Sequence, residues 1–192
     1  MKAMGKRAWA SLAVLVLLAF AWTSCGDDET GSNKVVTPVV ASEGTAEMAV
    51  DAVSGGEITA ATEVRGTGPF DIDINVLAAT TGYQAYQYYL EWDPNLLALD
   101  EHRDLKPDGL ELCAKPAISA DVVAAGCVNV TEATTFAGPV STITFHCVAN
   151  GTSVLHLLTS AEDPASYSTA MAPRGVVVQT NLTDASVTCL GS

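Results

Sequence analysis

The chain has 192 residues, of which 22 are acidic and 9 are basic, and its formal net charge is −13. This charge argues against binding to nucleic acid or to anionic lipid head groups, because both need a basic protein face. Hydrophobic residues make up 48% of the chain and five residues are cysteine. The length is that of one ordinary domain or two small ones, and it is enough to bury a core without a metal.

Residues 1–24 are predicted to be an export signal. Lys2, Lys6 and Arg7 give it a basic start, and residues 8–22 form a largely apolar stretch. This stretch is short for a membrane-spanning helix, although an uncleaved anchor is the alternative interpretation. Cleavage would remove three basic residues and no acidic one, which changes the net charge from −13 to −16.

Two cleavage sites compete at the end of this segment. The sequence Ala19-Phe20-Ala21 has the small-x-small pattern of ordinary signal peptidase sites. The sequence Thr23-Ser24-Cys25-Gly26 resembles the lipobox of bacterial lipoproteins, although Trp22 stands where that family prefers leucine. The resemblance implies a lipid at Cys25, which would be the protein's only link to a membrane. We therefore expect a secreted or cell-surface protein, lipid-anchored at Cys25, with residues 25–44 as a flexible tether.

The number of cysteines fits the lipoprotein interpretation. If Cys25 carries lipid, four cysteines remain, which suits two disulfides in an oxidising compartment. Residues 143–147 and 185–189 alternate so that Cys147 and Cys189 both point inward on their strands. Cys113 and Cys127 flank a predicted strand–loop–strand. Four cysteines allow three pairings, and the strand geometry favours Cys113–Cys127 with Cys147–Cys189.

Residues 45–192 have the pattern of an all-β sandwich. Short alternating runs are separated by Gly, Pro, Asn and Asp, with no convincing amphipathic helix or long repeat. The clearest strands are expected at 70–76 and 86–92, followed by a turn at Asp93-Pro94-Asn95 and by later strands at 140–148, 153–158, 175–180 and 185–189. The intervening residues 100–109 form the densest charged patch, which is predicted to be a solvated loop.

Three segments resemble the cohesin family. The first is an aromatic-Gln-aromatic-x-Leu-x-aromatic-Asp-Pro-x-x-Leu run, whose places are filled by Tyr86, Gln87, Tyr88, Leu90, Trp92, Asp93, Pro94 and Leu97. The second is the strand that follows Gly138, and the third is the closing strand at 185–188. The three segments occur in the family's order. The resemblance runs over roughly residues 45 to 192.

The resemblance implies a cohesin-like jelly-roll sandwich of about nine strands that binds a partner rather than catalysing a reaction. Cohesins bind dockerins through the face of one sheet. The corresponding strands here are expected to expose a set of partner-binding residues, namely Gln87, Tyr89, Glu91, Thr142, Thr144 and His146. Tyr89 is the candidate aromatic anchor. The disulfides and the single module depart from the usual cohesin pattern, so a dockerin-like protein and another surface partner both remain open.

The alternatives are a carbohydrate-binding module of the same superfamily, a structural stalk domain and, least favoured, a hydrolase. A carbohydrate-binding module needs a row of exposed aromatic residues, for which Tyr89, Tyr83 and Tyr167 are candidates. No nucleophile elbow, phosphate-binding loop or dinucleotide motif occurs, so no catalytic residue is nominated. The three sequons, at Asn129, Asn150 and Asn181, are interpreted as chance matches in a Thr-rich chain.

No cofactor or metal is predicted. The three histidines, His102, His146 and His156, lack the spacing of metal ligands and are interpreted as ordinary surface or edge residues. Asp71, Asp73 and Asn75 alternate along one strand and are expected to form a solvated face. Calcium binding there, or at the charged patch, is possible in principle but unsupported, because the EF-hand pattern is absent.

Overall fold

The computed structural model describes residues 46–79, 82–107, 109–159, 161–162, 168–171, 177–178 and 180–191. The predicted signal at 1–24, the tether at 25–44, the lipidation site Cys25 and the candidate Tyr167 lie outside the described residues. Within the described part, no helix is long and apolar enough to cross a membrane.

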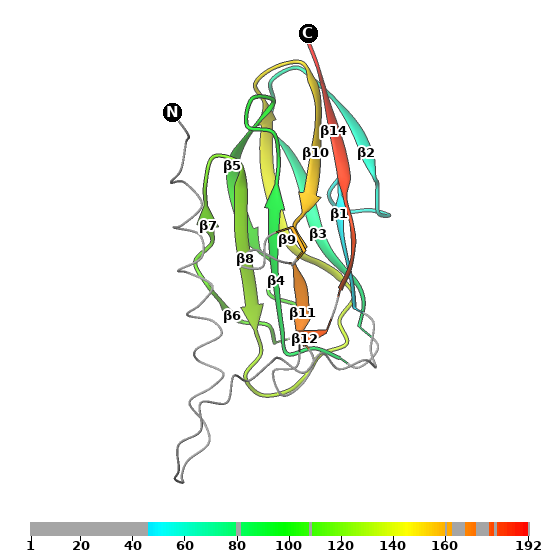
Figure 1. The fold of residues 1–192 in the computed structure, drawn as a ribbon, viewed down its shortest axis with the longest axis vertical. Helices are drawn as coiled ribbons and strands as arrows, with labels where there is room; N and C mark the ends of the chain where they lie inside the picture. Colours follow the sequence, from blue (N-terminus) through cyan, green and yellow to red (C-terminus); the bar gives the residue numbers. More distant parts are fainter. Residues whose placement is uncertain are drawn as a thin grey trace.

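The prediction of an all-β sandwich is confirmed: the described secondary structure consists of strands in two sheets (Figure 1). Four of the strands, β6, β7, β11 and β12, have only two or three residues, so the described strands outnumber the nine expected. The strands are β1 (Ala46–Asp51), β2 (Ala61–Arg65), β3 (Phe70–Ala79), β4 (Ala85–Glu91), β5 (Leu97–Asp104), β6 (Leu112–Cys113), β7 (Ala117–Ile118), β8 (Val122–Val128), β9 (Gly138–Cys147), β10 (Gly151–Leu157), β11 (Thr169–Met171), β12 (Val177–Val178), β13 (Thr180–Thr183) and β14 (Ala185–Leu190).

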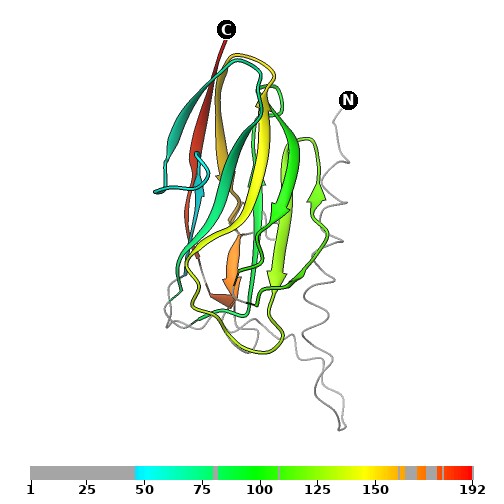
Figure 2. The same cartoon turned by 180° about the vertical axis from the view of Figure 1, so that it is seen from behind.

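The first sheet has the order β13-β1-β3-β9-β5 and faces the viewer in Figure 2. Its centre is the antiparallel pair β3 and β9, in which Ile72 lies opposite Ile143 and Phe70 opposite Phe145. Alternation along β3 sends Ile72, Ile74 and Val76 into the core, where each is fully buried. We call this sheet the β3–β9 sheet.

The second sheet contains the path β12-β11-β4-β10-β14-β2, and β8 pairs with β4 on the other side. It lies in front in Figure 1. β4 runs antiparallel to β8 and to β10, whereas β14 and β2 are parallel. Tyr88 and Leu90 of β4 face inward and pack in the same core as Phe145. We call this sheet the β4–β10 sheet.

Both predicted disulfides are present. Cys147 and Cys189 join β9 of one sheet to β14 of the other, with Cα atoms 5.8 Å apart. Cys113 and Cys127 lie directly opposite each other on β6 and β8. The first bridge therefore links the two sheets, and the second links the short strand β6 to β8.

The predicted solvated loop at 100–109 is wrong in its first half, because residues 100–104 belong to β5. β5 is the edge strand of its sheet and pairs only with β9 among the described strands. Its charged side chains Asp100, Glu101 and Arg103 are exposed, which an edge strand tolerates. The register shifts between Leu99 and Glu101, so Asp100 is the extra residue of a bulge.

Candidate functional site

The six predicted partner-binding residues do not form one surface, which corrects the sequence-based expectation. Gln87, Tyr89 and Glu91 lie on β4, in the β4–β10 sheet. Thr142, Thr144 and His146 lie on β9, in the β3–β9 sheet. Alternation identifies which side chains face the core, but it does not say which of the two sheets a strand joins.

Two of the β4 residues are also not exposed. Gln87 is 7% exposed and Tyr89 is 1% exposed, although both lie outside the central core cluster. β4 is an interior strand, flanked by β8 on one side and by β10 and β11 on the other. The Leu158 amide donates to the Tyr89 carbonyl, and the Tyr89 amide donates to Ser168 Oγ. Tyr89 is therefore not an exposed anchor, and Glu91 is the member of this trio that stays partly exposed.

The β9 trio belongs to a polar network on the outer face of its own sheet. Thr142 donates to Asp73 across the strands at 2.7 Å, and Thr144 donates to Asp71 at 2.6 Å. Asp73 and Thr142 are buried, because the loop after β1 folds over them and donates from Ser54 Oγ to Asp73. The face of β3 that was expected to be solvated is therefore partly covered by this loop, which Asp73 holds in place.

His146 is the last member of the β9 trio along the strand and lies next to β5. Its Nδ1 lies 2.8 Å from Asp100 Oδ1, which is carried by the bulge of β5. Both side chains are partly exposed. The predicted surface character of His146 agrees with this placement.

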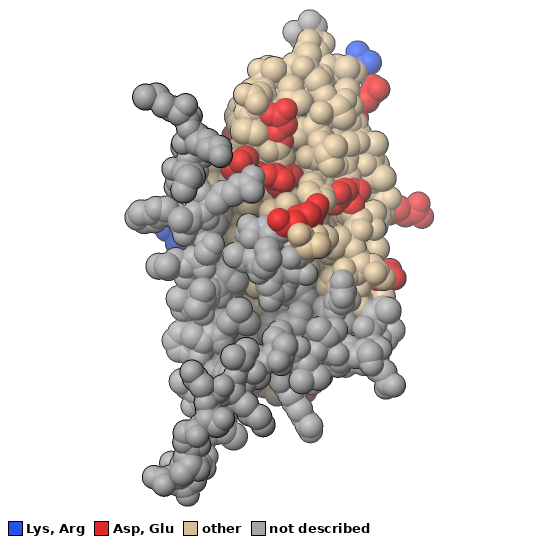
Figure 3. All heavy atoms as spheres, in the orientation of Figure 1, with Lys and Arg blue, Asp and Glu red and all other residues tan. Residues whose placement is uncertain are grey.

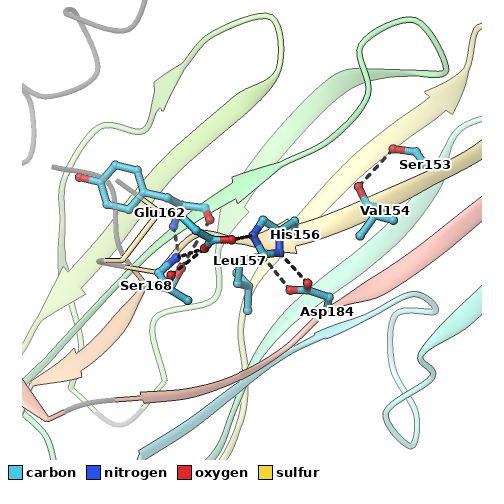
Figure 4. Close-up of polar contacts among 9 residues, drawn as sticks. Ser153, Val154, His156, Leu157, Glu162, Ser168 and Asp184 are labelled. Atoms are coloured by element: carbon cyan, nitrogen blue, oxygen red, sulfur yellow. Dashed lines mark hydrogen bonds and ion pairs between the residues drawn. The ribbon is translucent and has the colours of Figure 1, made fainter. Parts of the chain in front are cut away.

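A more concentrated polar group surrounds His156 on β10. Its Nδ1 lies 2.6 Å from Asp184 Oδ2, and its Nε2 lies 2.8 Å from Glu162 Oε1. Figure 4 shows the ring between the two carboxylates, which come from the link before β14 and from the segment after β10. Glu162 also accepts from the Thr159 amide and hydroxyl. We call His156, Asp184, Glu162 and Thr159 the His156 cluster.

The electrostatics of the His156 cluster favour a charged imidazole. Partial burial works to lower the pKa of His156, but hydrogen bonds and charges from Asp184 and Glu162 outweigh it and raise the pKa above its usual 6.5. The Thr159 hydroxyl and amide, followed by His156, lower the pKa of Glu162 to about 2. The cluster thus places the His156 ring between two carboxylates, an arrangement that favours the protonated imidazole.

The surface around the cluster is acidic. His156 lies opposite Glu91 in the β10–β4 register, and Val154, two residues earlier on the same face, is 54% exposed. Figure 3 shows acidic side chains in a band across the face over β4, β10 and β14. Glu91, Val154 and the His156 cluster are called the docking patch below. It is an acidic surface with one exposed apolar side chain.

His102 differs from its predicted role as a surface residue. Its side chain is 2% exposed, and its Nε2 lies 2.7 Å from the hydroxyl of Tyr88 in the core. Burial lowers the pKa of His102 and raises the pKa of Asp104, whose carboxylate lies 3.7 Å from the ring. His102 and Asp104 belong to β5 and Tyr88 belongs to β4, so the Tyr88–His102 contact joins the two sheets.

One group of described residues brings three possible metal-ligating atoms within 4.8 Å, namely Asp104, Cys113 and Cys127. Both sulfurs are bonded to each other in the disulfide, so they are not thiolate ligands. The exposed aromatic row needed for carbohydrate binding is also absent from the described residues. Tyr83, Tyr86, Tyr88, Tyr89 and Trp92 are all buried.

The sequence does not predict the His156 cluster. Residues 155–157 read Leu-His-Leu, which correctly suggests a histidine on the outer face of a strand. Asp184 lies 28 residues away and Glu162 lies in an irregular segment. Only the pairing of β10 with β14 brings Asp184 beside the ring, and no local motif encodes that pairing.

Neither a family profile nor a curated protein sequence matches the chain, but solved structures do. A non-cellulosomal cohesin from the archaeon Archaeoglobus fulgidus is 9% identical over 76% of this chain and 91% of its own, with a TM-score of 0.56. The cohesin of a type I cohesin–dockerin complex from Clostridium thermocellum is 15% identical over 76% and 99%, with a TM-score of 0.57.

A third structure is the cohesin module of a family 33 glycoside hydrolase from Clostridium perfringens. It is 14% identical over 78% of this chain and 98% of that module, with a TM-score of 0.57. At these identities the likeness concerns the fold. The described chain therefore has a cohesin-like fold, as the three sequence segments predicted.

Proposed function

We propose that this cohesin-like domain is a non-catalytic binding module that holds a protein partner of the dockerin kind. The observation that carries the proposal is the shared fold, because solved domains of this fold include the cohesin of a type I cohesin–dockerin complex.

The β4–β10 sheet presents the proposed binding face. Glu91 of the predicted β4 trio is partly exposed there, beside Val154 and the His156 cluster. An interface of this kind combines an apolar contact with a polar, charged rim. On the other sheet, Thr142 and Thr144 bond to Asp73 and Asp71, so those hydroxyls are engaged within the domain.

The proposal includes export and a surface location. The basic start and apolar stretch before Cys25 support a cleaved signal, and the two disulfides suit an oxidising compartment. Lipidation at Cys25 would hold the domain at the membrane through residues 25–44. Metabolic labelling with a clickable fatty acid should label the wild-type chain and leave Cys25→Ala unlabelled. Labelling of neither protein would contradict the anchor.

Co-purification followed by reconstitution tests the binding function. The domain is first used to capture partners from the secreted proteins of its source organism under native conditions. Each captured protein is then purified and titrated against the domain by calorimetry. A saturable complex of fixed stoichiometry with one protein supports the proposal. The absence of any protein that rebinds in purified form would contradict it.

The buried aromatics count against the carbohydrate-binding alternative, because sugar-binding platforms need exposed rings and the described ones are buried. A glycan array provides the independent check. Binding to polysaccharide but to no protein would replace the present proposal with that alternative.

A further inference from the structure

The docking patch has more acidic side chains than basic ones among the described residues. Glu91, Glu162 and Asp184 contribute three carboxylates, and His156 is the one described side chain of the patch that can carry a positive charge. Glu162 and Asp184 both bond to the ring, whereas the Glu91 carboxylate has no hydrogen bond or ion pair with any described residue. Among the described residues, Glu91 is thus the member of the patch whose carboxylate has no partner.

No described cation is placed to neutralise Glu91. The Lys and Arg residues in the described part are Arg65, Arg103, Lys106 and Lys115. Arg65 pairs with Glu63 of its own strand at 3.9 Å. The other three lie on β5, just after β5 and just after β6. Among the described residues, the charge on the docking patch therefore remains open to a cation from a second molecule.

The patch also offers an apolar contact beside the charges. Val154 is 54% exposed and lies on the same strand face as His156. The neighbouring Thr152 and Thr188 bond to each other across β10 and β14, so their hydroxyls satisfy each other. A partner side chain that fits here carries a positive end and an apolar stem, which describes lysine and arginine.

We infer that the docking patch receives a basic segment of the partner protein, with a Lys or Arg side chain between Glu91 and Glu162 and its stem against Val154. The inference rests on the proposed function and adds the chemistry of the partner. Complementary charge raises the association rate and sets register more than it adds affinity. Binding should therefore weaken as salt screens the patch.

The pKa of His156 should change when the docking patch is occupied. The carboxylates facing it are Asp184 from the link before β14, Glu162 from the segment after β10 and Glu91 from β4. A partner cation that shares these carboxylates competes with the imidazolium. The pKa of His156 should therefore fall when the basic segment binds, and the complex should release protons near that pKa.

The test uses a hexa-arginine peptide as the basic probe and a hexa-glutamine peptide as the neutral control. Wild-type protein, Glu91→Gln and Glu101→Gln are titrated by NMR, with the His156 ring followed against pH. Glu101 is the matched control because it is exposed on β5 of the opposite sheet. We expect wild-type to bind hexa-arginine, Glu91→Gln to bind about threefold more weakly, and Glu101→Gln to bind like wild-type.

Three results would overturn the inference. They are equal binding of hexa-arginine and hexa-glutamine, equal weakening by Glu91→Gln and Glu101→Gln, and an unchanged pKa of His156 in the bound state. If a protein partner binds Glu91→Gln as tightly as wild-type, the partner does not place a basic segment on the docking patch, but the proposed function remains intact. The absence of any protein partner would instead remove the proposed function itself.

Discussion

The Cys147–Cys189 bridge should stabilise the domain more than the Cys113–Cys127 bridge. Cys147 and Cys189 are 42 residues apart in sequence, whereas Cys113 and Cys127 are 14 residues apart. A cross-link restricts the unfolded chain more when it closes a longer loop, and the chain-entropy relation gives about 4 kcal/mol for the first bridge and about 3 kcal/mol for the second. The predicted difference in the free energy of unfolding is therefore about 1 kcal/mol.

Double alanine variants measure this difference without leaving a lone thiol. The two variants are Cys147→Ala/Cys189→Ala and Cys113→Ala/Cys127→Ala. Each loses two sulfur atoms, so the loss of packing should be similar in both and should largely cancel when they are compared. Urea unfolding of both variants and of wild-type at one pH gives the three free energies of unfolding. The reasoning would be refuted if the Cys113/Cys127 variant lost as much stability as the other variant, or more.

The remaining predictions concern the His156 cluster, the buried network and the sheet backbone. The cluster should contribute most to the free energy of unfolding between about pH 4.5 and pH 6.5. The contribution of His156 is complete below pH 6.5 and is lost as pH rises through its raised pKa. The contribution of Glu162 is complete above pH 4.5 and is lost as pH falls towards its lowered pKa of about 2. The melting temperature of His156→Gln should therefore fall furthest below that of wild-type near pH 5.5 and least at pH 9; a gap that widened at high pH would show the sign to be wrong. Tyr88→Phe removes the hydroxyl that bonds to His102 and should cost about 1–2 kcal/mol in urea unfolding, whereas an unchanged midpoint would mean that the bond contributes nothing net. Gly126→Ala would place a Cβ against the Tyr86 carbonyl and 3.0 Å from Gln87 Cα on the neighbouring strand; it should cost about 1–3 kcal/mol, and a variant as stable as wild-type would contradict the close backbone approach.

The sequence predicted much of the sandwich because alternation is a local property. Residues 70–76 form most of β3, residues 86–91 form most of β4, and the inward positions of Cys147 and Cys189 led directly to their disulfide. The charged residues 100–104 were misread as a loop because an edge strand with a bulge has no strict alternation. The pattern of turn residues and apolar residues therefore does not predict such a strand.

The candidate site was much less predictable. Gln87 and Thr142 alternate as outward residues should, yet burial depends on what covers each face, and both are covered. The two trios were placed together because alternation says nothing about which sheet a strand joins. The His156 cluster depends on contacts between β10, the segment after it and the link before β14, which only the tertiary structure brings together.

Hydrogen–deuterium exchange on the domain bound to its purified protein partner tests the central claim most directly. If the domain is a protein-binding module that uses the docking patch, the amides of β4, β10 and the link before β14 should gain protection in the complex. Protection confined to β3, β9 and β5 of the opposite sheet would contradict the proposed face. A domain that binds no purified protein would contradict the proposed function as a whole.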